Sequence, residues 1–232
     1  MKYTYASIDI ETSSLHPSKG QVLELGVVID DLSVKVDRAD LEEYLEQLPK
    51  FHCYIKHPNV VGEHFAVSMH NRIWQVLAKE PVSYYFQEET NSIEDYNYRL
   101  NNNLPIVVEH GQVFHYFRDF LDDNNLLDLN ESGYPNSCTS LVIAGKNVAG
   151  FDIPFLSTLY GFNKEDNFND FFKFAHRTID PAMLYLQSTD NKPPSLNECL
   201  SRAGINKTVD HTAVGDALDV IRCLKMSTKL YE

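Results

Sequence analysis

Two carboxylates stand one residue apart at the end of an apolar segment near the N-terminus. The residues from Tyr3 to Ile10 include the aromatic and β-branched types that favour a strand, and residues two apart on a strand point to the same face. We therefore expect Asp9 and Glu11 to project together. Carboxylates held side by side repel each other and raise at least one pKa unless a cation lies between them, and such oxygen ligands suit Mg²⁺ or Mn²⁺. A lone Asp-x-Glu is more often a pair of solvated acids, so remote partners must decide between the two interpretations.

Three further residues that could bind a metal ion or move a proton lie in the second half of the chain. Asp152 follows a glycine-bounded turn from Gly145 to Gly150 and opens an expected helix, where the helix dipole favours an aspartate regardless of function. His211 stands five residues before Asp216, which lies near the start of the last expected helix. A histidine on the approach to a helix can reach a site without sharing the helical face of the aspartate. Each of these features is unremarkable alone.

The composition predicts a globular chain with a sizeable core. It has 232 residues, of which 43% are hydrophobic, enough for one large α/β domain or two small ones. The formal net charge of −13 would repel nucleic acid at long range, so such a substrate would need a local basic patch, bound metal ions, or both. The four cysteines are scattered without zinc-like spacing, and we expect reduced, buried thiols. Neither a signal-peptide pattern nor a membrane-spanning run is present in the sequence, so a cytoplasmic location is the default expectation.

Hydrophobic periodicity predicts strands first and mixed elements later. A hairpin is expected from Tyr3 to Ile10 and Gln21 to Ile29, and a third antiparallel strand from Phe51 to Lys56. A helix is expected from about Val67 to Lys79. The residues from Glu80 to Pro105 have no clean period and predict an irregular excursion, whose aromatic residues more often pack a loop down than stack on bases.

The second half of the chain predicts helices that alternate with short strands. An apolar face over Glu109 to Asn124 indicates a core-facing helix, and the apolar run Ser140 to Ala144 indicates a central strand buried on both faces. A short strand from Arg177 should pass into a helix with Pro181 in its first turn. Ser195 and Glu198 have the spacing of a capping box that opens a further helix.

Taken in chain order, three motifs resemble those of the DEDDh exonucleases, also called the DnaQ-like family, which have a ribonuclease H-like fold. The first, DIETSSL at 9–15, is similar to the family's D-x-E-T-T-G-L/M, with Ser14 where glycine is usual. The second, GKNVAGFDIPFL at 145–156, is similar to G-H-N-x-x-F-D-x-x-F-L, with Lys146 at the histidine position and one extra small residue before the phenylalanine. The third is His211-x4-Asp216. The segments RTIDP, with Asp180, and SLNECLSRAGI also have counterparts, so the similarity covers nearly the whole chain.

The resemblance implies a role for each matched residue. Asp9, Glu11 and Asp216 would bind a catalytic divalent ion, Asp9 would bridge to a second ion, and Asp152 would contact that second ion directly or through water. His211 would be the general base for the attacking water, since an imidazole titrates near neutral pH. Four further residues would contact the terminal nucleotide: Thr12 and Leu15 from the first motif, and Asn147 and Phe151 from the second.

The resemblance also implies the fold and the activity. We expect a single DEDDh exonuclease domain over residues 1–232, with the excursion at about 80–105. Its α/β fold would be a ribonuclease H-like mixed sheet, antiparallel in its first three strands and parallel afterwards, flanked by helices. With two Mg²⁺ or Mn²⁺ ions, the expected activity is release of nucleoside monophosphates from the 3′ end of single-stranded nucleic acid, with DNA slightly favoured.

Several alternatives stay open at this point. The substrate could instead be RNA or very short oligonucleotides, because discrimination by the 2′-hydroxyl depends on close geometry. In another class, the chain would be a non-catalytic protein that binds nucleic-acid ends. The expected partners are 3′ ends of single-stranded DNA or RNA, with no membrane. Several relatives are dimers, which leaves a homodimer open, as is an association with replication or repair proteins.

Overall fold

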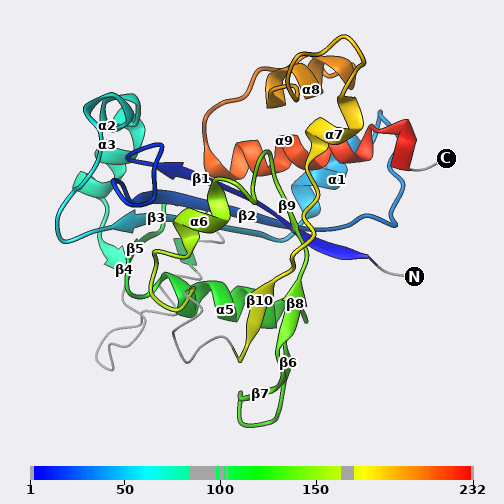
Figure 1. The fold of residues 1–232 in the computed structure, drawn as a ribbon. Coiled ribbons are helices and arrows are strands. Elements are labelled where there is room, and N and C mark those ends of the chain that lie inside the picture. The colour runs from blue at the N-terminus through cyan, green and yellow to red at the C-terminus, as the bar shows by residue number, and fades with distance from the viewer. Residues whose placement is uncertain (1–2, 84–97, 100–101, 103, 163–169, 231–232) are drawn as a thin grey trace.

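A six-stranded mixed sheet lies at the centre of the fold (Figure 1). The structure is a computed structural model that describes residues 3–83, 98–99, 102, 104–162 and 170–230. The strand order is β4-β5-β3-β2-β1-β9. The bounds are β1 Thr4–Thr12, β2 Val22–Asp31, β3 Lys50–Lys56, β4 Val82–Ser83, β5 Val107–Glu109 and β9 Ile143–Ala144. The first three strands pair antiparallel, whereas β9 runs parallel to β1 and β5 runs parallel to β3. This confirms the predicted α/β class and the change from antiparallel to parallel pairing.

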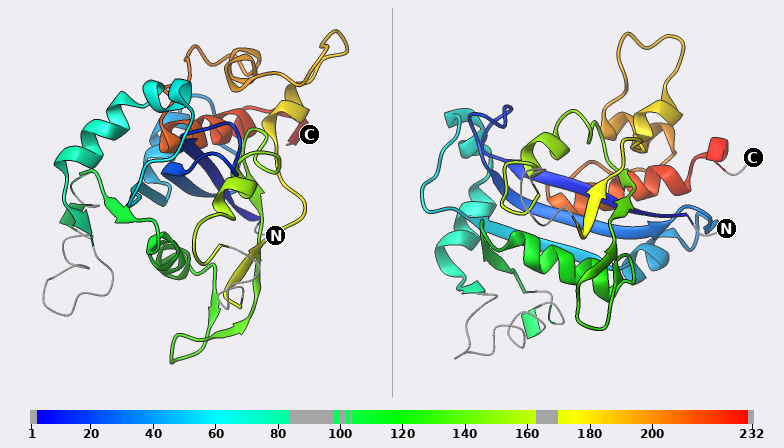
Figure 2. Two further views of the ribbon diagram at one scale, coloured as in Figure 1. Left: turned by 60° about the vertical axis from the view of Figure 1, so that its left-hand side comes forward. Right: turned by 60° about the horizontal axis from the view of Figure 1, so that its bottom comes forward.

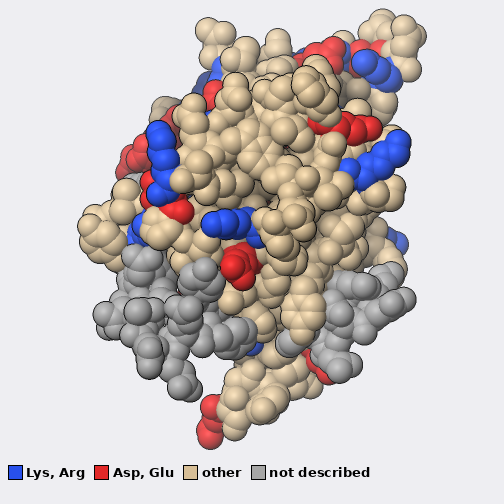
Figure 3. Space-filling model, turned by 90° about the vertical axis from the view of Figure 1, so that its left-hand side faces the viewer, with Lys and Arg blue, Asp and Glu red and all other residues tan. Residues whose placement is uncertain are grey.

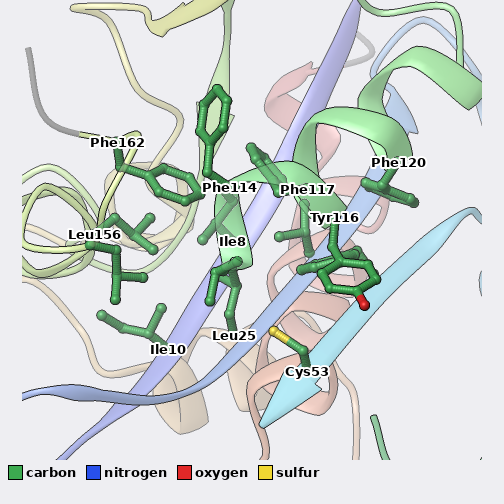
Figure 4. Packing of buried hydrophobic residues seen from close by; sticks show 14 of the residues in the cluster. Ile8, Ile10, Leu25, Cys53, Phe114, Tyr116, Phe117, Phe120, Leu156 and Phe162 are labelled. Carbon is green, nitrogen blue, oxygen red and sulfur yellow. The ribbon is translucent and has the colours of Figure 1, made fainter. Parts of the chain in front are cut away.

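The residues of β1 alternate between the two faces of the sheet, as the strand period requires. Ala6, Ile8 and Ile10 belong to the core beneath α5 (Val113–Asp123), while Tyr5 belongs to the core beneath α9 (Ala213–Lys225). Figure 1 shows α5 and α9 on opposite sides of the sheet. In Figure 4, Ile8 lies next to Phe114, and Ile10 lies near Leu156. The odd-numbered residues of β1, and with them Asp9 and Glu11, therefore face α9.

Short helices surround α9 and complete its layer. They are α1 (Leu41–Gln47), α7 (Pro181–Tyr185) and α8 (Leu196–Arg202), and the last described element is the 3-10 turn η1 (Thr228–Leu230). The predicted capping box is confirmed, because the Ser195 hydroxyl accepts from the Glu198 N–H and the Glu198 carboxylate accepts from the Ser195 N–H. Pro181 stands in the first turn of α7, as expected. The views in Figure 2 agree with this two-sided layering.

The prediction of one continuous helix from Val67 to Lys79 is wrong. Two helices occupy the region, α2 (His64–Met69) and α3 (Asn71–Lys79), and they meet at His70. His70 has φ −98° and ψ 38°, outside the helical range, and its N–H contacts the Val67 carbonyl at 3.4 Å. The break turns the chain so that α2 and α3 lie at the end of the sheet where β1 finishes (Figures 1 and 2).

The prediction of one central strand from Ser140 to Ala144 is also wrong. The segment divides into β8 (Thr139–Leu141), which pairs with β10 (Phe172–Phe174) in a separate two-stranded sheet, and β9, which joins the edge of the main sheet. The division falls at Val142, whose carbonyl accepts a hydrogen bond from the Ala6 N–H. Before β8, β6 (Asp128–Leu129) and β7 (Pro135–Ser137) pair antiparallel in a small two-stranded sheet of their own.

Other expectations have mixed outcomes. Most of the excursion at about 80–105 lies outside the described residues, although Val82 and Ser83 within it form β4. Three cysteines are buried as expected, but Cys138 is exposed, because it lies between two short strands away from the main core. In the described part of the chain, no helix is both long and apolar enough to cross a membrane.

Candidate metal centre at the end of strand β1

The pairing of β1 with β2 places the first two carboxylates next to the start of α9. Asp9 lies opposite Gly26, and Glu11 lies opposite Glu24. A Cβ atom at Gly26 would stand 2.3 Å from the backbone at the start of α9. Such a contact is impossible for any larger residue without displacing the helix. Glycine at this position therefore lets α9 begin directly on the strands, next to the carboxylates of β1.

The start of α9 brings His211 and Asp216 to the same end of β1. The Thr212 hydroxyl caps the helix by accepting the Gly215 N–H at 3.2 Å, which leaves Asp216 in the first turn and 8% exposed. His211 precedes the cap with φ 51°, in the left-handed region that residues other than glycine seldom adopt. The Ser7 hydroxyl donates to the Ala217 carbonyl at 2.8 Å and ties the helix to β1.

Asp152 reaches the site from the other edge of β1. It is the first residue of α6 (Asp152–Leu156), is 3% exposed, and follows a turn in which Asn147 has φ 57°. The turn is closed by the N–H groups of Gly150 and Phe151, which both donate to the Asn147 carbonyl. Asp180 holds the turn from outside, because its carboxylate accepts the Asn147 N–H at 2.9 Å.

The five residues expected from the three motifs lie around the end of β1, and three of them form a compact group. Glu11, His211 and Asp216 each offer a ligand atom within 4.8 Å of the others, an arrangement that could hold a metal ion. Asp9 lies close enough to Asp152, Asp216 and Glu11 for their charges to raise its pKa. Asp216 Oδ1 is buried and has no hydrogen-bond partner among the described residues. A buried carboxylate oxygen in that state is costly unless a cation binds it.

Burial raises the pKa values of the carboxyl groups of Asp9, Glu11, Asp152 and Asp216, and neighbouring charges add to the rise for all but Asp152. Burial raises the pKa of Glu11 to about 8, and the charges of Glu24 and Asp216 contribute to the rise. Burial, followed by the charge of Asp219, raises the pKa of Asp216 to about 6, against the lowering effect of His211.

The pKa values of Asp152 and Asp9 move in the same direction. Burial raises the pKa of Asp152 to about 7, although hydrogen bonds from its own N–H and from that of Ile10 act to lower it. Burial raises the pKa of Asp9 well above its usual value, and the neighbouring carboxylates raise it further. Burial is thus the first cause of the rise in all four groups, and the charges of other members of the cluster add to it for Asp9 and Glu11.

Glu24 is a fifth carboxylate that sequence reasoning missed. It is fully buried beside Glu11, but it bonds to His52 at 2.7 Å and to the guanidinium of Arg72. Burial alone would raise the pKa of Glu24, yet the hydrogen bonds from His52 and Arg72 lower it overall. A glutamate within the apolar run of β2 was the available signal, since a buried acid requires a cationic partner.

His70 is a second residue that the sequence did not identify. From the joint between α2 and α3, its Nε2 atom lies 3.0 Å from the Thr12 carbonyl and its Nδ1 atom lies 3.7 Å from Glu11 Oε2. Burial lowers the pKa of His70, and the charges of Arg72 and His211 act in the same direction, whereas the bond to Thr12 and the charge of Glu24 raise it. No spacing in the sequence linked this histidine to the first motif.

The four expected substrate contacts occupy different environments. Leu15 is 70% exposed in the loop after β1, and Asn147 is exposed in the turn before α6. Phe151 is half-buried, with its ring 5.1 Å from that of Phe155. Thr12 is buried, its hydroxyl donates to the Ser14 carbonyl at 2.7 Å, and its own carbonyl contacts His70. The Thr12 hydroxyl can thus still accept a hydrogen bond, but its proton is already used.

A cavity of about 360 Å³ lies near the carboxylates without including them. It is enclosed by α6 and β10, and its described lining includes Ile153, Phe172 and His176, but none of the five convergent residues. The candidate centre lies outside this cavity, at the end of β1.

Comparisons with known proteins give no further guidance on this site. No protein-family model matches the chain, and no curated protein has a sequence that matches it significantly. The chemistry of the site must therefore be argued from its residues.

Proposed function

We propose that the protein is a metal-dependent 3′-5′ exonuclease of the DEDDh type. One observation carries the proposal: residues from three motifs, spread from Asp9 to Asp216, form one cluster of carboxyl groups with raised pKa values beside a histidine. Structural ion pairs also perturb pKa values, but they pair acids with cations, whereas here the acids face each other.

The residues of the cluster fit a divalent metal ion. Asp9, Glu11, Asp152 and Asp216 supply carboxylate oxygens, the ligands that Mg²⁺ and Mn²⁺ prefer, and the unpartnered Oδ1 of Asp216 is a ready donor. A divalent ion bound there would polarise a phosphoryl oxygen and make water more acidic. The four carboxylates themselves would hold the ions and offset their charge, so that an anionic phosphodiester could approach the cluster.

His211 is the proposed general base. Its side chain is exposed at the edge of the cluster, with a ring nitrogen within 4.8 Å of ligand atoms on Glu11 and Asp216. An imidazole in that position can take a proton from water that approaches the phosphorus and then release it to solvent. Removal of a positioned base of this kind usually costs about 10²–10⁴-fold in rate.

The fold supports the same proposal. Three antiparallel strands, followed by β9 in parallel beside β1, are compatible with a ribonuclease H-like arrangement, with the carboxylates at the end of the first strand. Leu15, exposed just beyond β1, offers an apolar side chain where a terminal base would lie. On the face drawn in Figure 3, the described Lys and Arg residues form small separate groups rather than one basic surface. This distribution favours binding of a few nucleotides at one strand end over binding along a long stretch of nucleic acid.

The decisive experiment offers 5′-labelled single-stranded DNA, RNA of the same sequence, and dinucleotides to the purified protein with Mg²⁺, Mn²⁺ or a chelator. We expect stepwise shortening from the 3′ end that requires the metal, with DNA cleaved somewhat faster than RNA. Asp9→Asn is the inactive variant, and circular DNA is the control substrate. Faster cleavage of RNA or dinucleotides would assign an exoribonuclease or oligoribonuclease role.

Two other outcomes would contradict the proposal. Cleavage of the circle would indicate an endonuclease. Tight binding of 3′ ends without hydrolysis under any metal would indicate a non-catalytic protein that binds nucleic-acid ends.

A further inference from the structure

The loop after β1 is clamped at one end by the start of α2. The Glu63 N–H donates to the Ser13 carbonyl at 2.8 Å, and the Ser14 hydroxyl donates to the Glu63 carboxylate at 3.0 Å. A Cβ atom at Gly62 would stand 2.4 Å from the Ser13 carbonyl oxygen, so the two segments touch through their backbones. We call residues 61–70 the clip, because they hold the end of β1 from outside the sheet.

The other end of the clip is His70, which contacts the metal-binding motif itself. Its ring touches the Thr12 carbonyl through Nε2 at 3.0 Å and faces Glu11 Oε2 through Nδ1 at 3.7 Å. The side chains of His70 and Glu11 are only 11% and 14% exposed. Glu11 is therefore close both to the ring of His70 and to the ligand atoms of His211 and Asp216.

The contact to Thr12 fixes which nitrogen of His70 carries a proton. A carbonyl oxygen can only accept, so Nε2 must be the donor, and the ring is oriented by that bond. The bond falls where the β1–β2 register shifts, between Glu11 and Thr12. A register shift interrupts the regular ladder, and the hydrogen bond from His70 fixes the Thr12 carbonyl at that point.

Hydrogen bonds from Trp74 fix the backbone around His70, and this limits the movement of its ring. The Trp74 indole donates to the Val67 carbonyl at 2.7 Å, and the Trp74 N–H donates to the His70 carbonyl at 3.1 Å. These bonds bridge α2 and α3 across the joint. A glutamate side chain has several rotatable bonds and loses conformational entropy when its carboxylate binds an ion. Because the ring of His70 is fixed against Glu11, the side chain of Glu11 has fewer conformations beforehand and loses less entropy on binding.

We infer that His70 is a positioning residue that holds Glu11 and the Thr12 backbone in place for a divalent cation. The inference rests on the proposed function only in taking Glu11 as a metal ligand. Loss of a group that orients a metal ligand typically costs about 10–100-fold in metal affinity or activity. His70→Ala should therefore weaken Mn²⁺ binding about tenfold, even when no nucleic acid is present.

The test measures Mn²⁺ binding by calorimetry and by the electron paramagnetic resonance signal of free Mn²⁺, on folded protein without substrate. His70→Gln carries an amide nitrogen near the position of Nε2 and should recover most of the affinity, whereas His70→Asn, whose amide is too short to reach Thr12, should not. His64→Ala removes an exposed histidine at the first residue of α2, within the clip, and should bind Mn²⁺ like the wild type. Melting temperatures of all variants show whether the clip is intact.

The outcomes separate this inference from the proposed function. Weaker Mn²⁺ binding in the alanine and asparagine variants, with recovery in the glutamine variant, supports His70 as a positioning residue whether or not the wild type hydrolyses nucleic acid. Wild-type affinity in His70→Ala or in His70→Asn overturns it, even if the wild type proves to be an exonuclease. A wild type that binds no Mn²⁺ overturns both.

Discussion

Replacing one carboxylate of the cluster by an amide should stabilise the metal-free fold at alkaline pH while abolishing hydrolysis. Asp216 is the most direct choice, because its pKa rises from 3.8 to about 6, mainly through burial and then through the charge of Asp219. A raised pKa means that the folded state holds the proton more tightly than the unfolded state does. The stability that protonation contributes is therefore complete below pH 3.8 and is lost as the pH rises through about 6.

The size of the effect follows from the shift in pKa. One pKa unit corresponds to about 1.4 kcal/mol, so ionised Asp216 costs the folded state about 3 kcal/mol once the pH is well above 6. Asp216→Asn removes that charge and also relieves its neighbours Asp9 and Glu11. In a chelator, we expect the variant to exceed the wild type in free energy of unfolding by about 2–3 kcal/mol at pH 8 and by almost nothing at pH 4.

A matched control stands on the same helix. Asp219 is fully buried like its neighbour, but it bonds to Lys207 and to Arg222, each at 2.7 Å. Asp219→Asn leaves those cations without their partner and should destabilise the fold by about 3 kcal/mol. Urea unfolding followed by circular dichroism at several pH values measures both variants, with an unchanged m-value as the sign that the unfolded state is comparable. An Asp216→Asn variant less stable than the wild type at every pH, or a gap that does not grow with pH, would refute the repulsion argument.

Three further predictions concern the ions, the base and the turn before α6. Because the pKa of Glu11 is raised to about 8, mainly by burial, protons compete with the ion, and Mn²⁺ affinity measured by calorimetry should fall steadily between pH 8 and pH 6; an affinity independent of pH would contradict the ligand role. His211→Ala should lower kcat by about 10²–10⁴-fold in single-turnover assays while Mn²⁺ still binds, and a comparable loss of Mn²⁺ affinity would instead make His211 a metal ligand. Asp180→Ala removes the acceptor for the Asn147 N–H and the cap of α7, so we expect a loss of about 1 kcal/mol in urea unfolding together with a raised KM, whereas a KM equal to that of the wild type would detach Asn147 from substrate binding.

The sequence predicted the carboxylates of β1 because two independent regularities agree there. The strand period puts Asp9 and Glu11 on one face, and the apolar residues between and before them fit the opposite face, which packs against α5. The capping box at Ser195 was predictable for a similar reason, since both of its hydrogen bonds are made within four residues. Local chemistry of this kind can be inferred from spacing alone.

The errors lie where tertiary contacts override local pattern. The apolar spacing around His70 fits one continuous helix, but the side chain is needed at the end of β1, and the helix breaks at that residue. The apolar run Ser140 to Ala144 fits a single buried strand, but its two halves pair with different partners, β10 and β1. Periodicity reports burial, and it does not report which element provides the burial.

The buried acids of this fold divide into two kinds, and the division carries the functional argument. Glu24 and Asp219 are fully buried, more so than the members of the cluster, yet each is satisfied by cations of the protein: Arg72 and His52 for the first, Lys207 and Arg222 for the second. The pKa of Glu24 is accordingly lowered, mainly by those hydrogen bonds acting against burial, although it lies directly opposite Glu11, whose pKa is raised. The chain thus supplies protein cations to the carboxylates that maintain the fold and leaves the four at the end of β1 to repel one another. Repulsion between unpaired carboxylates lowers the stability of the fold. A cation bound from solution would remove that repulsion, which is the simplest reason for a folded chain to keep the four acids together.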